Sequence, residues 1–292
     1  MHLKVIYNPT AGRGRVRRRM PEVEEQFRAL GATVELYATT SADDLARAAA
    51  EASRDASVDR VVICGGDGSV HHAVRDFDLE RGTFAMLPLG SGDDFATVCN
   101  VPKDLGRACE IAVRGAVREV DVALANGIRY LGVAGLGFDS EVNEYANTIH
   151  YLGGSFVYVY ATLRLLPRFQ PHRVSIDGAP PAPIMFAAVG NSRQYGGGIR
   201  ITPDAKIDDG LLDACIVGRT SRWQLLLTMP RAYTGAHVKK SFVEVRRARE
   251  FAFDAERPLK VYGDGEYMTT TPVKFGLEAT RLRVVTGHSP RQ

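Results

Sequence analysis

Apolar positions follow two different periods in the first part of the chain. Short apolar runs, rich in β-branched residues, predict strands at Leu3–Tyr7, Thr33–Ala38, Val61–Cys64 and Thr83–Leu87. Between them, apolar residues recur at helical spacing and predict helices over Arg13–Leu30, in an Ala-rich stretch ending near Arg54, over Val70–Phe77 and over Leu105–Val113. Strands that alternate with helices across short connections predict a parallel α/β sheet.

The pattern changes near Glu119, where short strand-like runs begin to dominate. They are Arg118–Ala123, Arg129–Ala134, Arg173–Ile176, Ile184–Val189, Leu212–Val217, Val243–Phe253, Leu259–Tyr262 and Leu282–Val285. A helical stretch over Tyr151–Leu166 interrupts them. Many short strands joined by Gly, Pro and Asp turns predict an antiparallel β sandwich. We therefore expect an α/β domain over residues 1–120 and a β-sandwich domain over 121–285, with the tail 286–292 packing back on the first.

Composition and charge narrow the class of protein. The formal net charge of +3 gives no global field of the kind that nucleic-acid binders carry, so we expect no nucleic-acid partner. The four cysteines lack C-x-x-C spacing, which favours buried, reduced thiols and a cytoplasmic protein. The chain enters a strand at Leu3 without a signal-peptide core, and its longest uncharged apolar stretch, Tyr151–Leu163, is too short to span a bilayer. Any membrane contact is then peripheral.

The segment Arg60–Ala73 carries the most specific chemistry of the first domain. A buried strand breaks at Gly65 and Gly66, after which Asp67 and Ser69 offer oxygens that can cap a helix. A strand, a glycine turn and a helix start together present backbone N–H groups to an anion. The sequence predicts a phosphate site here, and the alternative is an ordinary glycine-rich turn.

Further candidate residues follow the other strands of the predicted sheet. Asn8 and the run Gly90–Asp94 stand, like Gly65–Ser69, at carboxyl ends of strands, where ligands collect in parallel sheets. No Walker-type sequence occurs, so phosphate would depend on backbone amides and the Ser69 and Ser91 hydroxyls. Asp67 and Asp94 suit Mg²⁺, although Asp94 could instead cap a helix beginning at Phe95.

Two turns of the second domain carry acids. Gly263–Glu266 alone predicts a surface hairpin turn, but phosphoryl transfer to an alcohol needs a carboxylate near the acceptor hydroxyl, and this turn would supply one across a cleft. Asp208–Leu211 is either a plain turn or a place where a carboxylate and carbonyls hold a hard cation.

Taken in order, these motifs resemble the diacylglycerol kinase catalytic-domain family, in its bacterial soluble lipid-kinase branch. The resemblance covers nearly the whole chain and rests on Asn8-Pro9 with Gly12, Gly65–Ser69, Pro88–Ala96, Asn191 with Gly196–Gly198, Pro203–Asp213 and Asp264–Glu266. It implies a Rossmann-like (phosphofructokinase-like) nucleotide domain followed by a β sandwich, with ATP in the cleft and a lipid hydroxyl presented from the second domain.

The resemblance also implies roles for individual residues. It assigns Asp67 and Asp94 to the catalytic magnesium network, Glu266 as proton acceptor, and Asp264 to the same network. It assigns nucleotide contacts to Asn8, Thr39, Gly65, Gly66, Asp67, Gly68, Ser69, Val70, His71 and Ser91. A second, structural Mg²⁺ would be held by Asp209 and by the backbone carbonyls of Lys206 and Leu211.

The chain departs from the family pattern at several of these positions. Ser69 and Ser91 replace threonines and keep the hydroxyl. His71-His72 stand where Asn-Glu is usual and could equally be solvated or core helix residues. Asp93 replaces an asparagine, which adds negative charge near the triphosphate and should weaken binding unless a metal or an arginine offsets it.

The sequence therefore predicts a cytoplasmic, ATP- and Mg²⁺-dependent kinase that phosphorylates diacylglycerol or a similar lipid at the inner face of the membrane. The alternatives are a kinase for a soluble acceptor such as a nicotinamide dinucleotide, and a non-catalytic nucleotide- or lipid-binding protein. The sequence does not decide whether the protein forms a homodimer. The basic cluster Arg13–Arg19 is either a solvated helix face or a phosphate or lipid-headgroup contact, and the apolar residues of Phe156–Leu166 form either an acyl-chain pocket or a core helix.

Overall fold

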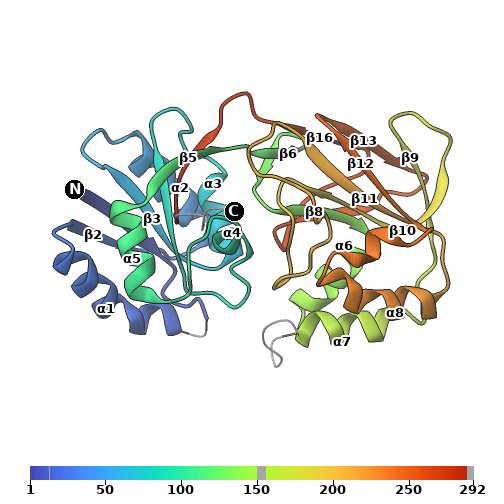
Figure 1. The fold of residues 1–292 in the computed structure, drawn as a ribbon, viewed down its shortest axis with the longest axis horizontal. Helices are drawn as coiled ribbons and strands as arrows, with labels where there is room; N and C mark the ends of the chain where they lie inside the picture. Colours follow the sequence, from blue (N-terminus) through green and yellow to red (C-terminus); the bar gives the residue numbers. More distant parts are fainter. Residues whose placement is uncertain (13, 150–155, 288–292) are drawn as a thin grey trace. The chain divides into compact units, whose positions relative to one another are not determined.

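The computed structural model describes residues 1–12, 14–149 and 156–287, which form two units (Figure 1). Unit 1 comprises Met1–Asp121 and the chain from Ala279 onward, and unit 2 comprises Val122–Glu278. The second unit is therefore inserted into the first in sequence. Each unit has its own sheet and its own buried core.

Unit 1 is built on a six-stranded sheet in the order β2-β1-β3-β4-β17-β5. The first five strands run parallel and β5 runs antiparallel to β17. The strands are β1 His2–Tyr7, β2 Thr33–Ala38, β3 Arg60–Gly65, β4 Thr83–Pro88, β5 Ala116–Val120 and β17 Leu282–Thr286. The helices of the unit are α1 Arg15–Ala29, α2 Ala42–Arg54, α3 Asp67–Val74, α4 Asp94–Val98 and α5 Leu105–Arg114. The predicted parallel α/β sheet is confirmed.

Burial explains why these segments form these elements. The run Val61–Cys64 of β3 is at most 1% exposed, as expected for a central strand covered on both faces. In α1 the residues Val16, Met20, Val23 and Phe27 recur at helical spacing and are the buried ones. Helix α3 begins at Asp67, three residues before the prediction, because the Gly66 carbonyl already accepts the N–H groups of Ser69 and Val70.

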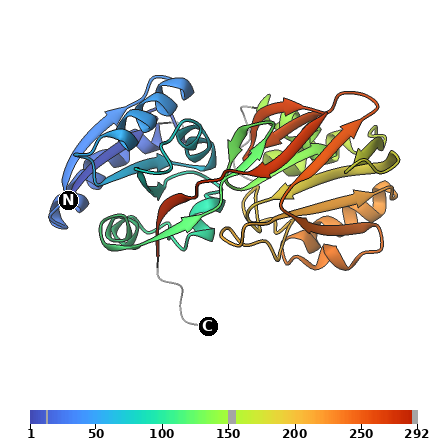
Figure 2. The same cartoon turned by 90° about the horizontal axis from the view of Figure 1, so that it is seen from above.

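The strand Leu282–Val285 does not lie in the β sandwich, where the sequence placed it. As β17 it lies between β4 and β5 in the sheet of unit 1, as Figure 2 shows for the red strand beside β5. The predicted strand Arg118–Ala123 is also two strands, since β5 ends at Val120 and β6 (Ala123–Ala125) belongs to unit 2. Apolar alternation reports that a strand is half-buried but not which sheet it joins. Residues 288–292 of the predicted tail lie outside the described residues.

Unit 2 contains an eleven-stranded antiparallel sheet among the described residues. Its main path runs β15-β14-β8-β10-β9-β13-β16-β6-β7, and β11 joins β10 and β12. Besides β6, the strands are β7 Ile128–Tyr130, β8 Val133–Gly137, β9 His172–Ile176, β10 Ala182–Gly190, β11 Leu212–Gly218, β12 Val243–Ala248, β13 Phe251–Ala255, β14 Lys260–Gly263, β15 Glu266–Thr270 and β16 Val273–Leu277. The predicted second fold, antiparallel and β-rich, is confirmed. The single strands predicted over Arg129–Ala134 and Val243–Phe253 are wrong, because each is two strands.

Side chains on the two faces of this sheet pack into two separate hydrophobic cores. In β10, Ala187 and Val189 face a core formed by the strands, whereas Met185 and Ala188 face a second core under the helices. The helices over this second core are α6 (Phe138–Asn147), α7 (Phe156–Leu165) and α8 (Arg222–Ala232), followed by the short 3₁₀ helix η1 (Ala236–Lys239). Helix α7 confirms part of the helix predicted at Tyr151–Leu166, whose first residues lie outside the described ranges.

Two predictions about the whole chain can be checked here. Over the described ranges, no helix has both the length and the apolar character needed to cross a bilayer. All four cysteines (Cys64, Cys99, Cys109 and Cys215) are buried free thiols, as predicted. Burial raises the pKa of the Cys99 and Cys215 thiols to about 12, so both remain protonated at neutral pH.

Candidate active site

The residues predicted to contact a nucleotide lie along one edge of the sheet in unit 1. Thr39 follows β2, Asn8 follows β1, Gly66 follows β3, and Ser91 lies in the loop after β4. These four strands are parallel neighbours, so their carboxyl ends share one edge. This is the edge at which open parallel sheets bind ligands.

The two loops after β3 and β4 touch each other through glycine backbone. The Leu89 N–H donates to the Gly65 carbonyl at 3.0 Å. A Cβ on Gly90 would stand 2.5 Å from the Gly66 Cα, and a Cβ on Gly65 would stand 2.3 Å from the Ser69 Oγ. Only glycine allows this approach, which leaves bare backbone beside the start of α3.

Asp67 holds the two loops together from the first turn of α3. Its Oδ1 accepts the Phe95 N–H at 3.1 Å and so caps α4 from outside that helix. Helix α4 begins at Asp94, and its N-cap residue is Asp93. The alternative that Asp94 itself is the cap is therefore wrong, and Asp94, a buried residue, lies beside the loop that carries Asp67.

Asp93 is a structural residue of the same loop. It adopts a left-handed conformation with φ of 59°, and its Oδ1 accepts the Gly90 N–H at 2.9 Å. Burial raises the pKa of the Asp93 carboxyl, while Lys103, with Nζ 3.3 Å from Oδ2, opposes that rise. The Lys103 ammonium also donates to the Ser91 carbonyl at 3.2 Å. The extra charge expected at Asp93 is thus offset by a lysine that the sequence reasoning missed.

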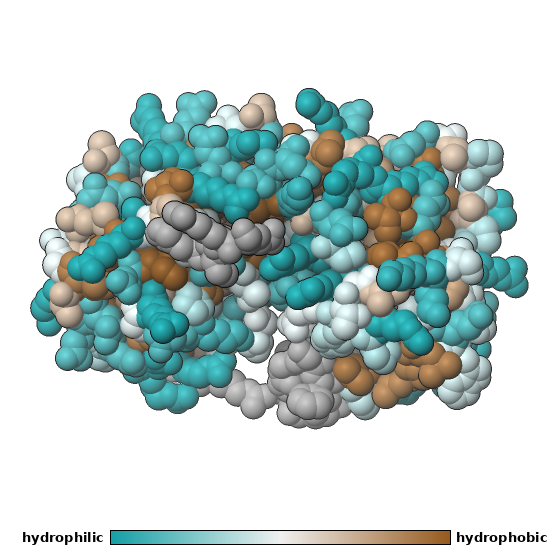
Figure 3. Space-filling model, viewed as in Figure 1, coloured by the Kyte–Doolittle hydropathy of each residue, from teal (hydrophilic) through white to brown (hydrophobic). Residues whose placement is uncertain are grey.

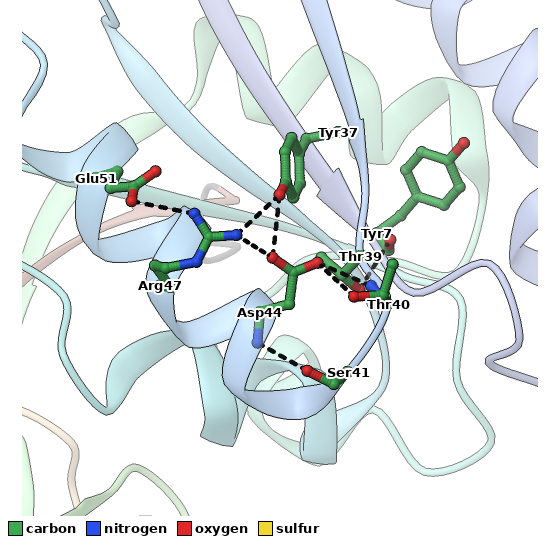
Figure 4. Close-up of polar contacts among 8 residues, drawn as sticks. All are labelled: Tyr7, Tyr37, Thr39, Thr40, Ser41, Asp44, Arg47 and Glu51. Atoms are coloured by element: carbon green, nitrogen blue, oxygen red, sulfur yellow. Dashed lines mark hydrogen bonds and ion pairs between the residues drawn. The ribbon is translucent and has the colours of Figure 1, made fainter.

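Thr39 is fixed by a polar network that Figure 4 shows around Asp44. The Thr39 N–H and hydroxyl donate to the Tyr7 carbonyl at 2.9 and 3.3 Å. The next residue, Thr40, donates its N–H to Asp44 Oδ2 at 2.8 Å, and the Tyr37 hydroxyl donates to Asp44 Oδ1 at 3.0 Å. The Thr40 N–H is the main reason that the pKa of Asp44 is lowered. The network holds the connection after β2 against β1.

The other predicted nucleotide residues of unit 1 have local roles in the structure. Asn8 Oδ1 accepts the Thr10 N–H at 2.9 Å and shapes the turn after β1. In α3, Val70 and His71 are buried, and the rings of His71 and His72 lie edge to face with centroids 5.4 Å apart. Arg13 lies outside the described residues, and Arg15 and Arg17 are exposed on α1.

In unit 2, Asp264 is held by the backbone at the start of β8. Its carboxylate accepts the N–H groups of Leu131, Gly132 and Val133 at 3.0, 2.9 and 3.2 Å. From the other side, the Asn191 amide donates to the Leu131 carbonyl at 3.1 Å. Residues 131–133 are thus clamped by two side chains distant in sequence, a role that the sequence reasoning did not predict for Asp264.

Glu266 follows Asp264 in the tight β14–β15 hairpin, as the turn prediction expected. Gly263 and Glu266 pair across the hairpin, and Asp264 and Gly265 both have positive φ. The Asn147 amide of α6 donates to the Gly265 carbonyl at 3.2 Å, and the Tyr158 hydroxyl of α7 lies 3.9 Å from where a Gly265 Cβ would stand. The half-buried Glu266 therefore lies in a turn braced by two helices.

The turn Lys206–Leu211 concentrates negative charge around one guanidinium. Asp209 Oδ1 accepts the Leu211 N–H at 3.1 Å, and Arg247 pairs with Asp213 at 2.9 Å. The pKa of the Asp213 carboxyl is raised, mainly by burial, and the negative charges of Asp209 and Asp204 add to this rise. No three Asp, Glu, His or Cys side chains of the described residues converge as a metal site. The excess of carboxylates nevertheless fits a hard cation held partly by carbonyls.

Comparisons with known proteins find a family match for each of the two units. The model of the diacylglycerol kinase catalytic domain matches residues 2–125, and that of the YegS C-terminal NAD kinase beta sandwich-like domain matches residues 132–286. A diacylglycerol kinase of Mycobacterium tuberculosis is 34% identical over 78% of this chain and 76% of its own. One from Bacillus subtilis is 26% identical over 93% and 92%. A probable lipid kinase YegS-like of Shewanella frigidimarina is 31% identical over 85% and 83%.

Solved structures show the same arrangement of elements. The crystal structure of a putative diacylglycerol kinase from Bacillus anthracis aligns with a TM-score of 0.80 at 25% identity, over 98% of this chain and 97% of that one. An NAD kinase from Archaeoglobus fulgidus, solved in complex with ATP, aligns with a TM-score of 0.54 at 14% identity over 98% and 94%. The second likeness is one of fold.

Proposed function

The chain belongs to the kinase family that combines the diacylglycerol kinase catalytic domain with the YegS-type β sandwich, and we propose that it transfers the γ-phosphoryl group of ATP to a hydroxyl of diacylglycerol or a similar lipid. Membership makes the chain a phosphotransferase. The nucleotide, the metal, the lipid acceptor and the residue roles are the proposal, together with a cytoplasmic location and contact with the membrane surface where the acceptor lies.

The observation that carries the proposal is the row of loops at one edge of the first sheet, with Gly66 and Gly90 in backbone contact. Backbone N–H groups at the start of α3 and the Ser69 hydroxyl would bind phosphate oxygens there. Ser91, on the loop after β4, would contribute a second hydroxyl. Positioning and charge neutralisation supply most of the rate enhancement in phosphoryl transfer, and this edge is suited to both.

Asp67 and Asp94 are the residues that would hold Mg²⁺ with the triphosphate. Both come from the two loops in contact, and Mg²⁺ prefers few carboxylates and several waters. When bound, Mg²⁺ neutralises the charge that develops on the transferred group. A second Mg²⁺ would be held by Asp209 and the carbonyls of Lys206 and Leu211, where it would stabilise the turn rather than act in the reaction.

Glu266 would accept the proton of the lipid hydroxyl. Of the two acids in its turn, Asp264 is the poorer base, because its oxygens already accept three backbone N–H groups. Asp264 would instead act as a positioning residue that fixes the β14–β15 hairpin. A general base of this kind contributes about 10²–10⁴-fold to rate.

The test is phosphorylation with labelled ATP of diacylglycerol in mixed micelles, of a total lipid extract, and of soluble acceptors including a nicotinamide dinucleotide. Glu266→Gln should keep ATP binding and lose about 10²–10⁴-fold in turnover. Glu250→Gln, at an exposed acid of the same unit, is the matched control. Label only in a soluble acceptor would overturn the lipid assignment, and near-normal turnover of Glu266→Gln would remove the base.

The non-catalytic alternative predicts tight ATP binding without label in any acceptor. The departures from the family pattern at His71, His72 and Asp93 are the features that favour this alternative. Asp93, however, has a cation partner and a structural role. His71 and His72 remain as departures from the family pattern. Replacing both with the usual Asn and Glu would test whether they alter the nucleotide preference, by comparing ATP with GTP as donor.

A further inference from the structure

Large apolar side chains are exposed on one part of unit 2. Of the ten exposed large hydrophobic residues among the described ones, six lie on α7, α8 or the residue after α8. Trp223 is 74% exposed, Leu227 66% and Leu163 52%. We name this set the α7–α8 surface, and it consists of Val159, Tyr160, Leu163, Trp223, Leu227 and Tyr233.

The spacing of these residues places them on the outward faces of the two helices. Val159 and Leu163 are four residues apart on α7, and so are Trp223 and Leu227 on α8. The opposite faces, with Ala161 of α7 and Leu225 of α8, are buried in the same core. The Arg222 guanidinium donates to the Phe169 carbonyl at 3.2 Å and ties the start of α8 to the chain after α7. Figure 3 shows a brown apolar patch over these helices at the lower right.

The charged residues of the two helices and of the chain beside them are all basic. Residues 156–171 and 219–240, which contain both helices, hold seven Arg and Lys residues and no Asp or Glu. The chain as a whole is nearly balanced, with 37 basic and 34 acidic residues, so composition does not explain the absence. Arg164, Arg168, Arg219, Arg231 and Lys239 are all exposed.

We propose that the α7–α8 surface docks on an anionic lipid bilayer, with Trp223, Leu227 and Leu163 entering the headgroup region and the surrounding arginines and lysines meeting lipid phosphates. Aromatic and aliphatic side chains beside basic ones are the combination that peripheral proteins use at such an interface. A second copy of the chain fits less well, because it would bring together two pairs of helices that carry only basic charges. The role of the surface rests on the lipid acceptor of the proposed function.

Helix α7, which carries part of this surface, also lies beside the turn that contains Glu266. Tyr158, on the same helix as Leu163, has its hydroxyl 3.9 Å from the Cβ position of Gly265, and α6 is bonded to the same residue through Asn147. A bilayer under α7 would thus bring lipid hydroxyls to the helix that braces the proposed base. Docking would raise the local concentration of acceptor without adding a catalytic group.

The experiment uses the full chain and its only tryptophan, which is Trp223 itself. We expect a blue shift of its emission on adding phosphatidylglycerol vesicles, none with phosphatidylcholine vesicles, and quenching by brominated acyl chains. In sedimentation with phosphatidylglycerol vesicles, Leu227→Glu should reduce partitioning at least about tenfold. Arg164→Gln with Arg168→Gln should reduce it roughly 25-fold, about fivefold for each charge. Val117→Glu, at an exposed apolar residue of unit 1, should leave it unchanged.

Melting temperatures of the variants would confirm that they are folded. Because vesicle binding is measured without ATP, the docking proposal can still be tested if the kinase assay shows no lipid phosphorylation. Wild type and Leu227→Glu should phosphorylate a water-soluble short-chain diacylglycerol at the same rate. With diacylglycerol in vesicles, Leu227→Glu should be slower than wild type. Unchanged emission with phosphatidylglycerol, or equal sedimentation of Leu227→Glu and wild type, would overturn the proposal. A dimer in light scattering that Leu227→Glu dissolves would assign the surface to a second copy and overturn it as well.

Discussion

The Asp139 carboxyl should make unit 2 less stable as the pH rises from about 4 to 6. Asp139 lies in the first turn of α6, and its Oδ1 accepts a hydrogen bond from the Tyr195 hydroxyl. Among the described residues, no donor bonds its buried Oδ2. Gly135 is packed so close that a Cβ there would stand 1.8 Å from this oxygen. A carboxylate at this position lacks the solvation that water would give it.

The magnitude follows from the shift in pKa. Burial raises the pKa of Asp139 from 3.8 to about 6, with the Tyr195 hydrogen bond opposing the rise. About two units at 1.36 kcal/mol each correspond to roughly 3 kcal/mol. The folded chain retains the proton to higher pH than the unfolded chain does, so stability decreases as the pH rises through this window. The full penalty is present above pH 6.

Asp139→Asn removes the ionisation while it keeps the shape and an oxygen that can accept from Tyr195. The difference in free energy of unfolding between the variant and wild type should therefore change with pH. We expect it to shift in favour of the variant by up to about 3 kcal/mol between pH 4 and pH 7. The neighbouring Tyr195 and Cys215 do not contribute, because burial raises the pKa of both above this range.

The assay is urea denaturation at several pH values, with pulsed hydrogen exchange to separate the unfolding of unit 2 from that of unit 1. Only the change with pH is compared, because the asparagine amide has its own solvation cost at every pH. Asp254→Asn, at an exposed acid of the same unit, is the control. A difference between Asp139→Asn and wild type that stays constant from pH 4 to pH 8 would show that the carboxyl is solvated, and the reasoning would fail.

Three further predictions concern the loops of the candidate site. Asp264→Ala leaves three backbone N–H groups without an acceptor and should lower the stability of unit 2 by about 3–5 kcal/mol, measured by urea denaturation, with a smaller loss for Asp264→Asn. Gly90→Ala places a Cβ 2.5 Å from the Gly66 Cα and should weaken ATP binding tenfold or more in titration calorimetry, while unit 2 melts normally. Lys103→Met leaves the Asp93 carboxylate buried without its cation. Since burial already raises the Asp93 pKa, the loss of about 1–3 kcal/mol should be largest at pH 8 and nearly absent at pH 4.

Local periodicity was sufficient to predict most of unit 1. Strand β3 is apolar at consecutive positions because both of its faces are covered, and α1 repeats its buried residues with helical spacing. Both patterns involve residues close together in the sequence, and so they can be recognised without knowledge of the fold. Helix α8 was missed because its exposed face is apolar as well, so its sequence lacks the contrast between faces that predicts a helix.

Long-range pairing could not be predicted in the same way. Nothing in the sequence of β17 distinguishes a partner in unit 1 from one in unit 2, since the two alternatives bury the same side chains. The role of Asp264 depends on the backbone of residues 131–133, more than a hundred positions away. Lys103 acts on Asp93 only because the chain turns back after α4. Motif spacing singled out candidate acids but could not predict which backbone groups and side chains each one contacts.

The position of β17 has a consequence for the order in which the chain can fold during synthesis. The strand pairs with both β4 and β5, so these two lack a shared neighbour until residues 282–286 have left the ribosome. The nascent first unit then carries exposed strand edges throughout translation of the entire sandwich, a period in which such edges favour aggregation. The sheet of unit 1 can therefore be completed only after the whole of unit 2 has been synthesised.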